Sequence, residues 1–221
     1  MLCGPAAFFY CLMMDRFDVY SQLVWDLWSN GKGALGSFLI KPSENTMKVK
    51  DLFGGGQRPR VSAIDWITMA SLRDSSNNLL QYESVGDKVS AITLWGDIEK
   101  WMVSVGAKKT FSNISMTHSS IADIFKLNSL VNDDNHIISL ISAGMLQLGA
   151  DVPFKDHWIV WGGKLKLLNG NDITSDTKLS EYVSLKLFSW GEVKENSLKK
   201  GLTLGDFLNY TFGGMVFTKI P

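Results

Sequence analysis

The chain begins with a continuous apolar run rather than an amphipathic stripe. Residues 1–14 carry no charge, and Asp15 is the first charged residue. Fourteen residues are fewer than the roughly 20 that a membrane-spanning helix needs. The run also lacks the basic region and the small-residue cleavage site that are typical of a signal peptide. We therefore expect residues 1–14 to form a helix that is buried in the core.

Helical and extended patterns follow this run. From Phe17 to Ser29, apolar residues recur at helical spacing, and Asn30-Gly31 is a stop signal. Further helices are expected over residues 64–72, 94–105 and 117–130. Residues 34–40, 110–116 and 137–146 have the patterns of extended segments.

The last third of the chain changes character. Extended segments at 157–161, 164–168 and 182–190 are separated by glycine, asparagine and aspartate turns. Thr203 then opens a short helix, with Asp206 at the fourth position of a capping box. Helices come first and antiparallel strands last, which predicts an α+β fold with segregated layers.

Composition and charge narrow the possible functions. The 221 residues include 22 Lys and Arg and 22 Asp and Glu, so the formal net charge is zero. No basic field is available for a nucleic acid or an anionic membrane. Cys3 and Cys11 lie roughly 12 Å apart along one helix, which is too far for a disulfide. Two cysteines and three histidines give no zinc-site spacing, and we expect no cofactor or metal.

Cys3 is the main candidate nucleophile. It precedes Pro5, which suits the first turn of a helix because its missing N–H needs no partner there. The helix dipole and the unpaired N–H groups of a first turn favour thiolate over thiol. The alternative is that Cys3 is a small buried residue at a frayed terminus, and composition alone does not separate the two.

A thiolate enzyme also needs a base, and the chain has three histidines. His157 opens the apolar segment 157–161, where a rigid strand can hold it at the edge of a core. His118 lies in a segment that caps a predicted helix, and His136 follows a polar turn. We interpret those two as solvated or structural, and His157 as the base.

Two short motifs resemble those of a known family. The helix start CGPAA (residues 3–7) is similar to the Cys-Gly-x-Ala-Ala/Ser start of the bacteriocin-processing, double-glycine-leader peptidases and their papain-like relatives. The strand HWIV (157–160) resembles the His-aromatic/aliphatic-Val-Val strand of the same group. The order and separation of cysteine and histidine are also similar to those of papain-type enzymes. Residues 30–150 have no counterpart, and we interpret them as a family-specific insertion.

The resemblance implies a single papain-like catalytic domain over residues 1–221. In that fold the helix that carries Cys3 packs on the C-terminal antiparallel sheet. The resemblance further implies a bacterial toxin or effector domain, carried as the C-terminal part of a larger protein. Such a domain is delivered without a signal peptide, for instance by type VI secretion, from the producer's cytoplasm into a competing cell. The implied partners are a protein or peptide substrate and a cognate immunity protein, with no nucleic acid or membrane.

Two parts of a papain-like site are not fixed by the motifs. No glutamine precedes Cys3 in this sequence, so the usual oxyanion donor is expected upstream in a longer protein or is replaced, and the N–H of Cys3 is another donor. The residue that orients His157 depends on how segment 157–161 pairs. Pairing with 164–168 brings Asp172 near, and pairing with 182–190 brings Ser189. Asp172 is the first choice because a carboxylate fixes the imidazole tautomer; Ser189 is second and Asp156 third.

Other functions remain compatible with the sequence. The same Cys–His pair could catalyse acyl transfer or glutamine deamidation, and peptidoglycan amidases also occur on this fold. A different class is a non-catalytic binding protein with a degenerate peptidase fold, which loss of thiol reactivity would favour. Trp158, Trp161 and Trp190 lie on the C-terminal strands and are interpreted as core, with the wall of a substrate groove as the alternative.

Overall fold

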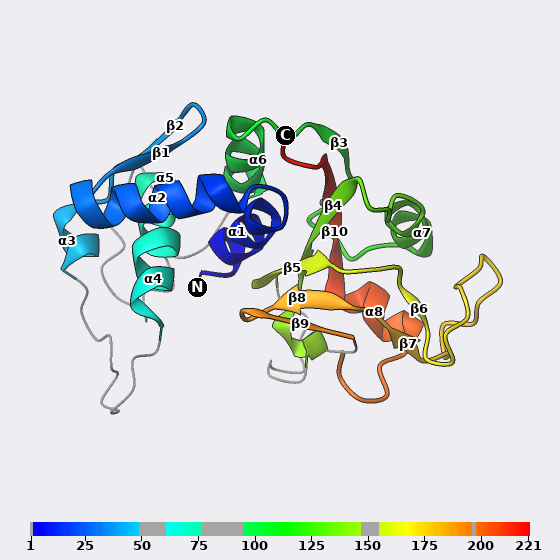
Figure 1. Ribbon diagram of the computed structural model, residues 1–221. Coiled ribbons are helices and arrows are strands. Elements are labelled where there is room, and N and C mark those ends of the chain that lie inside the picture. The colour runs from blue at the N-terminus through cyan, green and yellow to red at the C-terminus, as the bar shows by residue number, and fades with distance from the viewer. Residues whose placement is uncertain (1, 49–60, 77–94, 147–154, 196–197) are drawn as a thin grey trace, which may run out of the picture. The chain divides into compact units, whose positions relative to one another are not determined.

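Helices dominate the first half of the chain and antiparallel strands the second, so the predicted α+β class is confirmed (Figure 1). The computed structural model describes residues 2–48, 61–76, 95–146, 155–195 and 198–221. Contacts divide the chain into two units, residues 1–107 with 220–221 and residues 108–219. The boundary between the units, at residues 107–108, falls inside the stretch 30–150, which we interpreted from the sequence as one insertion.

The first helix, α1 (Cys3–Asp15), lies in the core of the first unit. Its residues Phe8, Cys11 and Leu12 are fully buried, and the Phe8 ring packs at 5.9 Å from that of Trp101. A helix that is apolar on all sides is typical of a core position, and its exposed residues, Met13 and Met14, lie near its C-terminal end. The predicted core helix is therefore confirmed. No helix among the described residues is long and apolar enough to cross a membrane.

The first unit also contains a strand hairpin and further helices. Gly31 ends α2 in the left-handed conformation (φ 65°), as the predicted stop signal requires. Residues 34–40, expected as one extended segment, form a hairpin instead because the chain turns at Gly36. The elements are α2 (Phe17–Asn30), β1 (Gly33–Leu35), β2 (Phe38–Ile40), α3 (Glu44–Met47), α4 (Ala63–Asp65), α5 (Ser71–Ser76) and α6 (Trp95–Ser104).

Between α4 and α5 the helix continues through a π-helical turn, Trp66–Ala70. Ser62 caps the start of this run, since its side chain accepts the N–H of Asp65 at 3.1 Å. At its other end, a partly buried ion pair joins Arg73 of α5 to Asp97 of α6 at 2.7 Å. The helix predicted over 64–72 is confirmed, but the sequence pattern did not indicate its π-helical turn.

The second unit is built on a six-stranded antiparallel sheet with the order β3-β10-β4-β5-β8-β9. The last strand of the chain, β10, lies inside the sheet, and the sequence analysis did not predict it. The strands are β3 (Lys109–Ser112), β4 (Asn135–Ile141), β5 (His157–Trp161), β8 (Leu187–Ser189), β9 (Glu192–Lys194) and β10 (Thr211–Thr218). A separate pair is formed by β6 (Lys166–Leu167) and β7 (Val183–Ser184).

Two capped helices contribute to the core on one face of this sheet. In α7 (Ile121–Ser129) and α8 (Leu204–Tyr210), capping boxes begin at Ser120 and Thr203, so the box predicted at Thr203 is confirmed. Side chains of both helices pack with Ile159 and Trp161 of β5. Because side chains alternate along a strand, His157 lies on the same face of the sheet as Ile159 and Trp161. It is the first residue of β5 and therefore lies at the end of this face.

Candidate active site

Cys3 occupies the first position of α1 and is half-buried. The helix begins after Leu2, whose carbonyl accepts the first helical hydrogen bond from the Ala6 N–H at 2.9 Å. Pro5 sits in the first turn, where its missing N–H costs no hydrogen bond. The thiol therefore lies at the positive end of the helix, in the environment that the sequence predicts for a reactive cysteine.

Cys11 provides an internal comparison. It lies on the same helix, is fully buried, and forms no disulfide with Cys3. Burial raises the pKa of the Cys11 thiol, and the nearby Asp15 carboxylate adds to the effect. A thiol in such surroundings stays protonated and unreactive. The two cysteines of the chain thus have contrasting environments.

His157 lies at the start of β5 and is 3% exposed. Its Nε2 atom is 2.7 Å from the Oγ atom of Ser189, and Nδ1 makes no hydrogen bond to any described residue. Burial lowers the pKa of His157 from 6.5 to about 4. The imidazole is therefore neutral at pH 7, with one nitrogen held and the other available to accept or donate a proton.

Strand pairing explains why Ser189 meets His157. Strand β5 pairs antiparallel with β8, with Val160 opposite Phe188. In this register Ser189 falls opposite Ile159, which is the next same-face residue after His157. Diagonal neighbours on one face of a sheet are within reach of long side chains. The structure thus has the second of the two strand pairings that the sequence left open.

Trp190 covers the imidazole from the β8–β9 hairpin. Its ring stacks on that of His157, with centroids 4.7 Å apart and planes inclined by 27°. Trp190 has φ 48° and Gly191 φ 80°, as in a two-residue hairpin turn that normally favours Asn-Gly. A bulky residue in this conformation is strained by about 1–2 kcal/mol. Trp190 is still 52% exposed, so it also faces solvent and is not a core residue.

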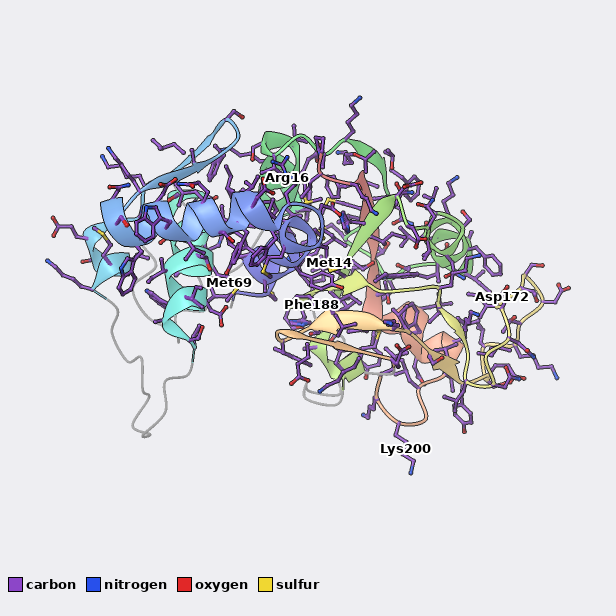
Figure 2. All side chains as sticks on the ribbon, in the orientation of Figure 1. Met14, Arg16, Met69, Asp172, Phe188 and Lys200 are labelled. Atoms are coloured by element: carbon purple, nitrogen blue, oxygen red, sulfur yellow. The ribbon has the colours of Figure 1, made fainter. Side chains whose placement is uncertain are left out.

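The other two residues expected to orient His157 lie elsewhere. Asp172 is exposed in the turn after β6, where it bridges to Lys166 and forms an ion pair at 4.0 Å. Figure 2 places Asp172 in this turn, far from Phe188, the neighbour of Ser189 on β8. Asp156 accepts the N–H of Ala143 at 2.8 Å. Among the described residues, Ser189 is the one that bonds to the His157 ring.

The two remaining histidines are also in the second unit. His118 is exposed, and its ring lies 5.0 Å from that of Phe212. His136 is on β4, opposite Phe217 of β10. In the part of the chain that the structure describes, no three His, Cys, Asp or Glu side chains converge in a way that could hold a metal ion.

Cys3 belongs to the first unit and His157 to the second, so their pairing stays a prediction. Sequence reasoning did not identify the stacking of Trp190 on His157. The signal that could have indicated it is the Trp-Gly pair that ends the predicted extended segment 182–190. No protein-family model matches the chain, and neither does any curated protein or solved structure. The likeness to papain-like peptidases therefore rests on the CGPAA and HWIV motifs and on the order and separation of Cys3 and His157.

Proposed function

We propose that the chain is a papain-like cysteine peptidase in which Cys3 is the nucleophile, His157 the proton carrier and Ser189 the residue that orients His157. The observation that carries the proposal is the state of the imidazole. It is buried and neutral, its Nε2 is held by Ser189, and its Nδ1 makes no hydrogen bond to the described residues. A base held in this way has one nitrogen fixed and the other available for catalysis.

In the proposed first step, the Cys3 thiol transfers its proton to Nδ1 of His157, and the thiolate attacks the carbonyl carbon of the substrate. A C–S bond forms and the carbonyl oxygen becomes an oxyanion, which the backbone N–H of Cys3 can stabilise. The imidazolium returns its proton to the amine nitrogen as the C–N bond breaks. Water then attacks the thioester, His157 takes a proton from it, and the C–S bond breaks to release the acid. The imidazolium returns this proton to the Cys3 thiolate, which restores the starting state. The mechanism requires Cys3 Sγ to come within hydrogen-bond reach of Nδ1.

Ser189 fits the orienting role better than a nucleophilic one. It is buried beside the ring, and its Oγ atom lies 2.7 Å from Nε2, the nitrogen opposite the one that carries the proton in this proposal. A hydroxyl can accept the Nε2–H of the tautomer that leaves Nδ1 as the base. It carries no charge, however, so it stabilises imidazolium less than the carboxylate of other triads. The thiolate of Cys3 must then supply most of the stabilisation of the imidazolium.

The biological setting in this proposal rests on the motifs alone. In this proposal the chain is a bacterial effector domain that acts on a protein in the cytoplasm of a competing cell and is neutralised by an immunity protein. The same first chemical step would serve glutamine deamidation or acyl transfer. Those activities differ in their products and not in their nucleophile.

The test is mass spectrometry of a bacterial lysate incubated with the protein or its variants. The proposal predicts new peptide termini with the wild type and none with Cys3→Ala or His157→Ala. Cys11→Ala and His118→Ala are matched controls, because each removes the same type of side chain from a position without a proposed role. Deamidated glutamines without new termini would assign the chain to the deamidases. Identical lysates with the wild type and with folded Cys3→Ala would contradict thiol catalysis.

A further inference from the structure

We propose that Trp66, on the π-helical turn of the first unit, is a positioning residue for Cys3. By packing against Leu2, it holds the first turn of the helix that carries the nucleophile. This inference rests on the proposed function and adds a residue that neither the motifs nor the proposed mechanism includes.

Helix α1 starts without a capping side chain. Its N-cap is Leu2 (φ −105°, ψ 16°), and no side chain accepts an N–H of the first turn. In contrast, α3, α4, α7 and α8 each begin after a serine or threonine whose side-chain oxygen accepts such an N–H. A helix start without this hydrogen bond frays unless other contacts hold it. The start that carries Cys3 therefore needs another form of support.

Packing takes the place of the missing cap. Leu2 and Val61 pack against the buried pair Trp66 and Ala70. The Trp66 indole is itself fixed, since its Nε1–H donates to the buried carbonyl of Thr46 at 2.9 Å. Leu2 thus packs on one side against a cluster whose aromatic ring is fixed. On the other side its carbonyl accepts the N–H of Ala6 at 2.9 Å, which closes the first turn around Cys3.

The π-helical turn is the element that presents Trp66. It interrupts a helical run from Ala63 to Ser76, and Figure 1 shows α4 and α5 as the two ends of this run. Within this run the Thr68 hydroxyl donates to the Ile64 carbonyl at 2.8 Å. Such turns are rare and occur frequently at functional sites. Here the turn packs beside the residue that precedes the nucleophile.

The first turn of α1 determines how strongly Cys3 is activated. Stabilisation of a thiolate by the helix dipole acts within the first turn and depends on that turn being formed. When Leu2 loses its support, the turn frays and the thiolate is less favoured at low pH. The measurable consequence is a shift of the pH dependence of Cys3 alkylation towards higher pH.

The experiment measures the rate of Cys3 alkylation by iodoacetamide between pH 5 and 9, with the full chain and mass spectrometry of the Cys3 peptide. In Leu2→Ala and Trp66→Ala, Cys3 should be alkylated about threefold to tenfold more slowly than in the wild type at pH 6. Trp66→Phe keeps the ring against Leu2 and should restore most of the rate. Trp28→Ala is the matched control, because Trp28 is 71% exposed on α2 of the same unit. Circular dichroism verifies that each variant is folded.

One result would overturn the role of Trp66 and leave the proposed function intact. In that result, folded Leu2→Ala and Trp66→Ala are alkylated at the wild-type rate, and the pH midpoint of the wild type lies well below that of an ordinary thiol. A wild-type midpoint near the ordinary value of about 8.5 would instead contradict the proposed function itself. If Trp66→Ala does not fold, Leu2→Ala decides the question, because Leu2 is only half-buried and its loss removes the same contact.

Discussion

Removing the Trp190 ring is predicted to raise the pKa of His157. Burial lowers that pKa from 6.5 to about 4, which corresponds to about 3 kcal/mol in favour of the neutral imidazole. The Trp190 ring covers one face of the imidazole at 4.7 Å. Trp190→Ala opens that face to water, while the strands still bury the opposite one. The pKa of His157 should therefore rise only part of the way, to about 5–6.

The titration can be followed by NMR of the imidazole ring protons in a Cys3→Ala background, where no thiolate contributes. Trp190→Phe retains an aromatic ring and should leave the pKa of His157 close to 4. Trp25→Ala, which removes an exposed tryptophan from α2, controls for general effects of the substitution. If the pKa of His157 in Trp190→Ala stays near 4, the strands alone bury the imidazole, and the shielding role assigned to Trp190 is wrong.

Three further predictions concern the orienting residue, the pH dependence of stability and a close backbone approach. Ser189→Ala should slow turnover by about 10- to 100-fold and keep Cys3 alkylation within about threefold, whereas Asp172→Ala should leave both unchanged; full activity in Ser189→Ala would remove Ser189 from the site. As the pH falls below 6.5, His157 is protonated in the unfolded chain before it is protonated in the folded one. The free energy of unfolding therefore decreases, by about 2.5 kcal/mol between pH 7 and pH 4.5. Urea unfolding at pH 7 and 4.5 should show this loss in the wild type and not in His157→Gln, and equal losses would contradict the burial of a neutral imidazole. Gly36 and Gly170 both have positive φ, but only at Gly36 would a Cβ atom overlap backbone, the Ser104 carbonyl. Gly36→Ala should therefore lower the free energy of unfolding by about 3 kcal/mol or more, and Gly170→Ala by about 1 kcal/mol. Similar melting temperatures for the two variants would contradict this and show that the end of the helix that carries Ser104 moves aside easily.

Local patterns were enough to predict much of the fold. The apolar run of residues 1–14 predicted a core helix, and the capping box at Thr203 predicted the start of α8. Strand β10 was missed because it contains Gly213-Gly214, a pair that is typical of turns. Gly213 adopts φ 92° at a bulge, and a Cβ atom on Gly214 would lie 2.7 Å from the Oγ of Ser139. These glycines serve close packing inside the sheet, which depends on distant residues.

The candidate site shows the same division between local and distant information. The strand that begins at His157 was predicted correctly from its own residues. The residue that hydrogen-bonds to its imidazole was not, because the choice between Asp172 and Ser189 depends on which strand pairs with β5. The carboxylate was preferred for its chemistry, but the strand register brings the hydroxyl to the ring. The contact between Leu2 and Trp66 was also out of reach, since it depends on a π-helical turn that periodicity does not reveal.

The pairing of Cys3 with His157 is the central claim, and the alkylation of Cys3 in wild type and His157→Ala tests it most directly. Iodoacetamide is added at pH 6, and the Cys3 and Cys11 peptides are quantified separately by mass spectrometry, with His118→Ala as the control. In the proposed dyad the neutral imidazole takes up the proton of the Cys3 thiol, and the ion pair that forms favours the thiolate. Removal of His157 should therefore slow Cys3 alkylation by about tenfold or more, while His118→Ala matches the wild type and Cys11 stays unmodified. Equal rates for Cys3 in the wild type and in folded His157→Ala would contradict the dyad.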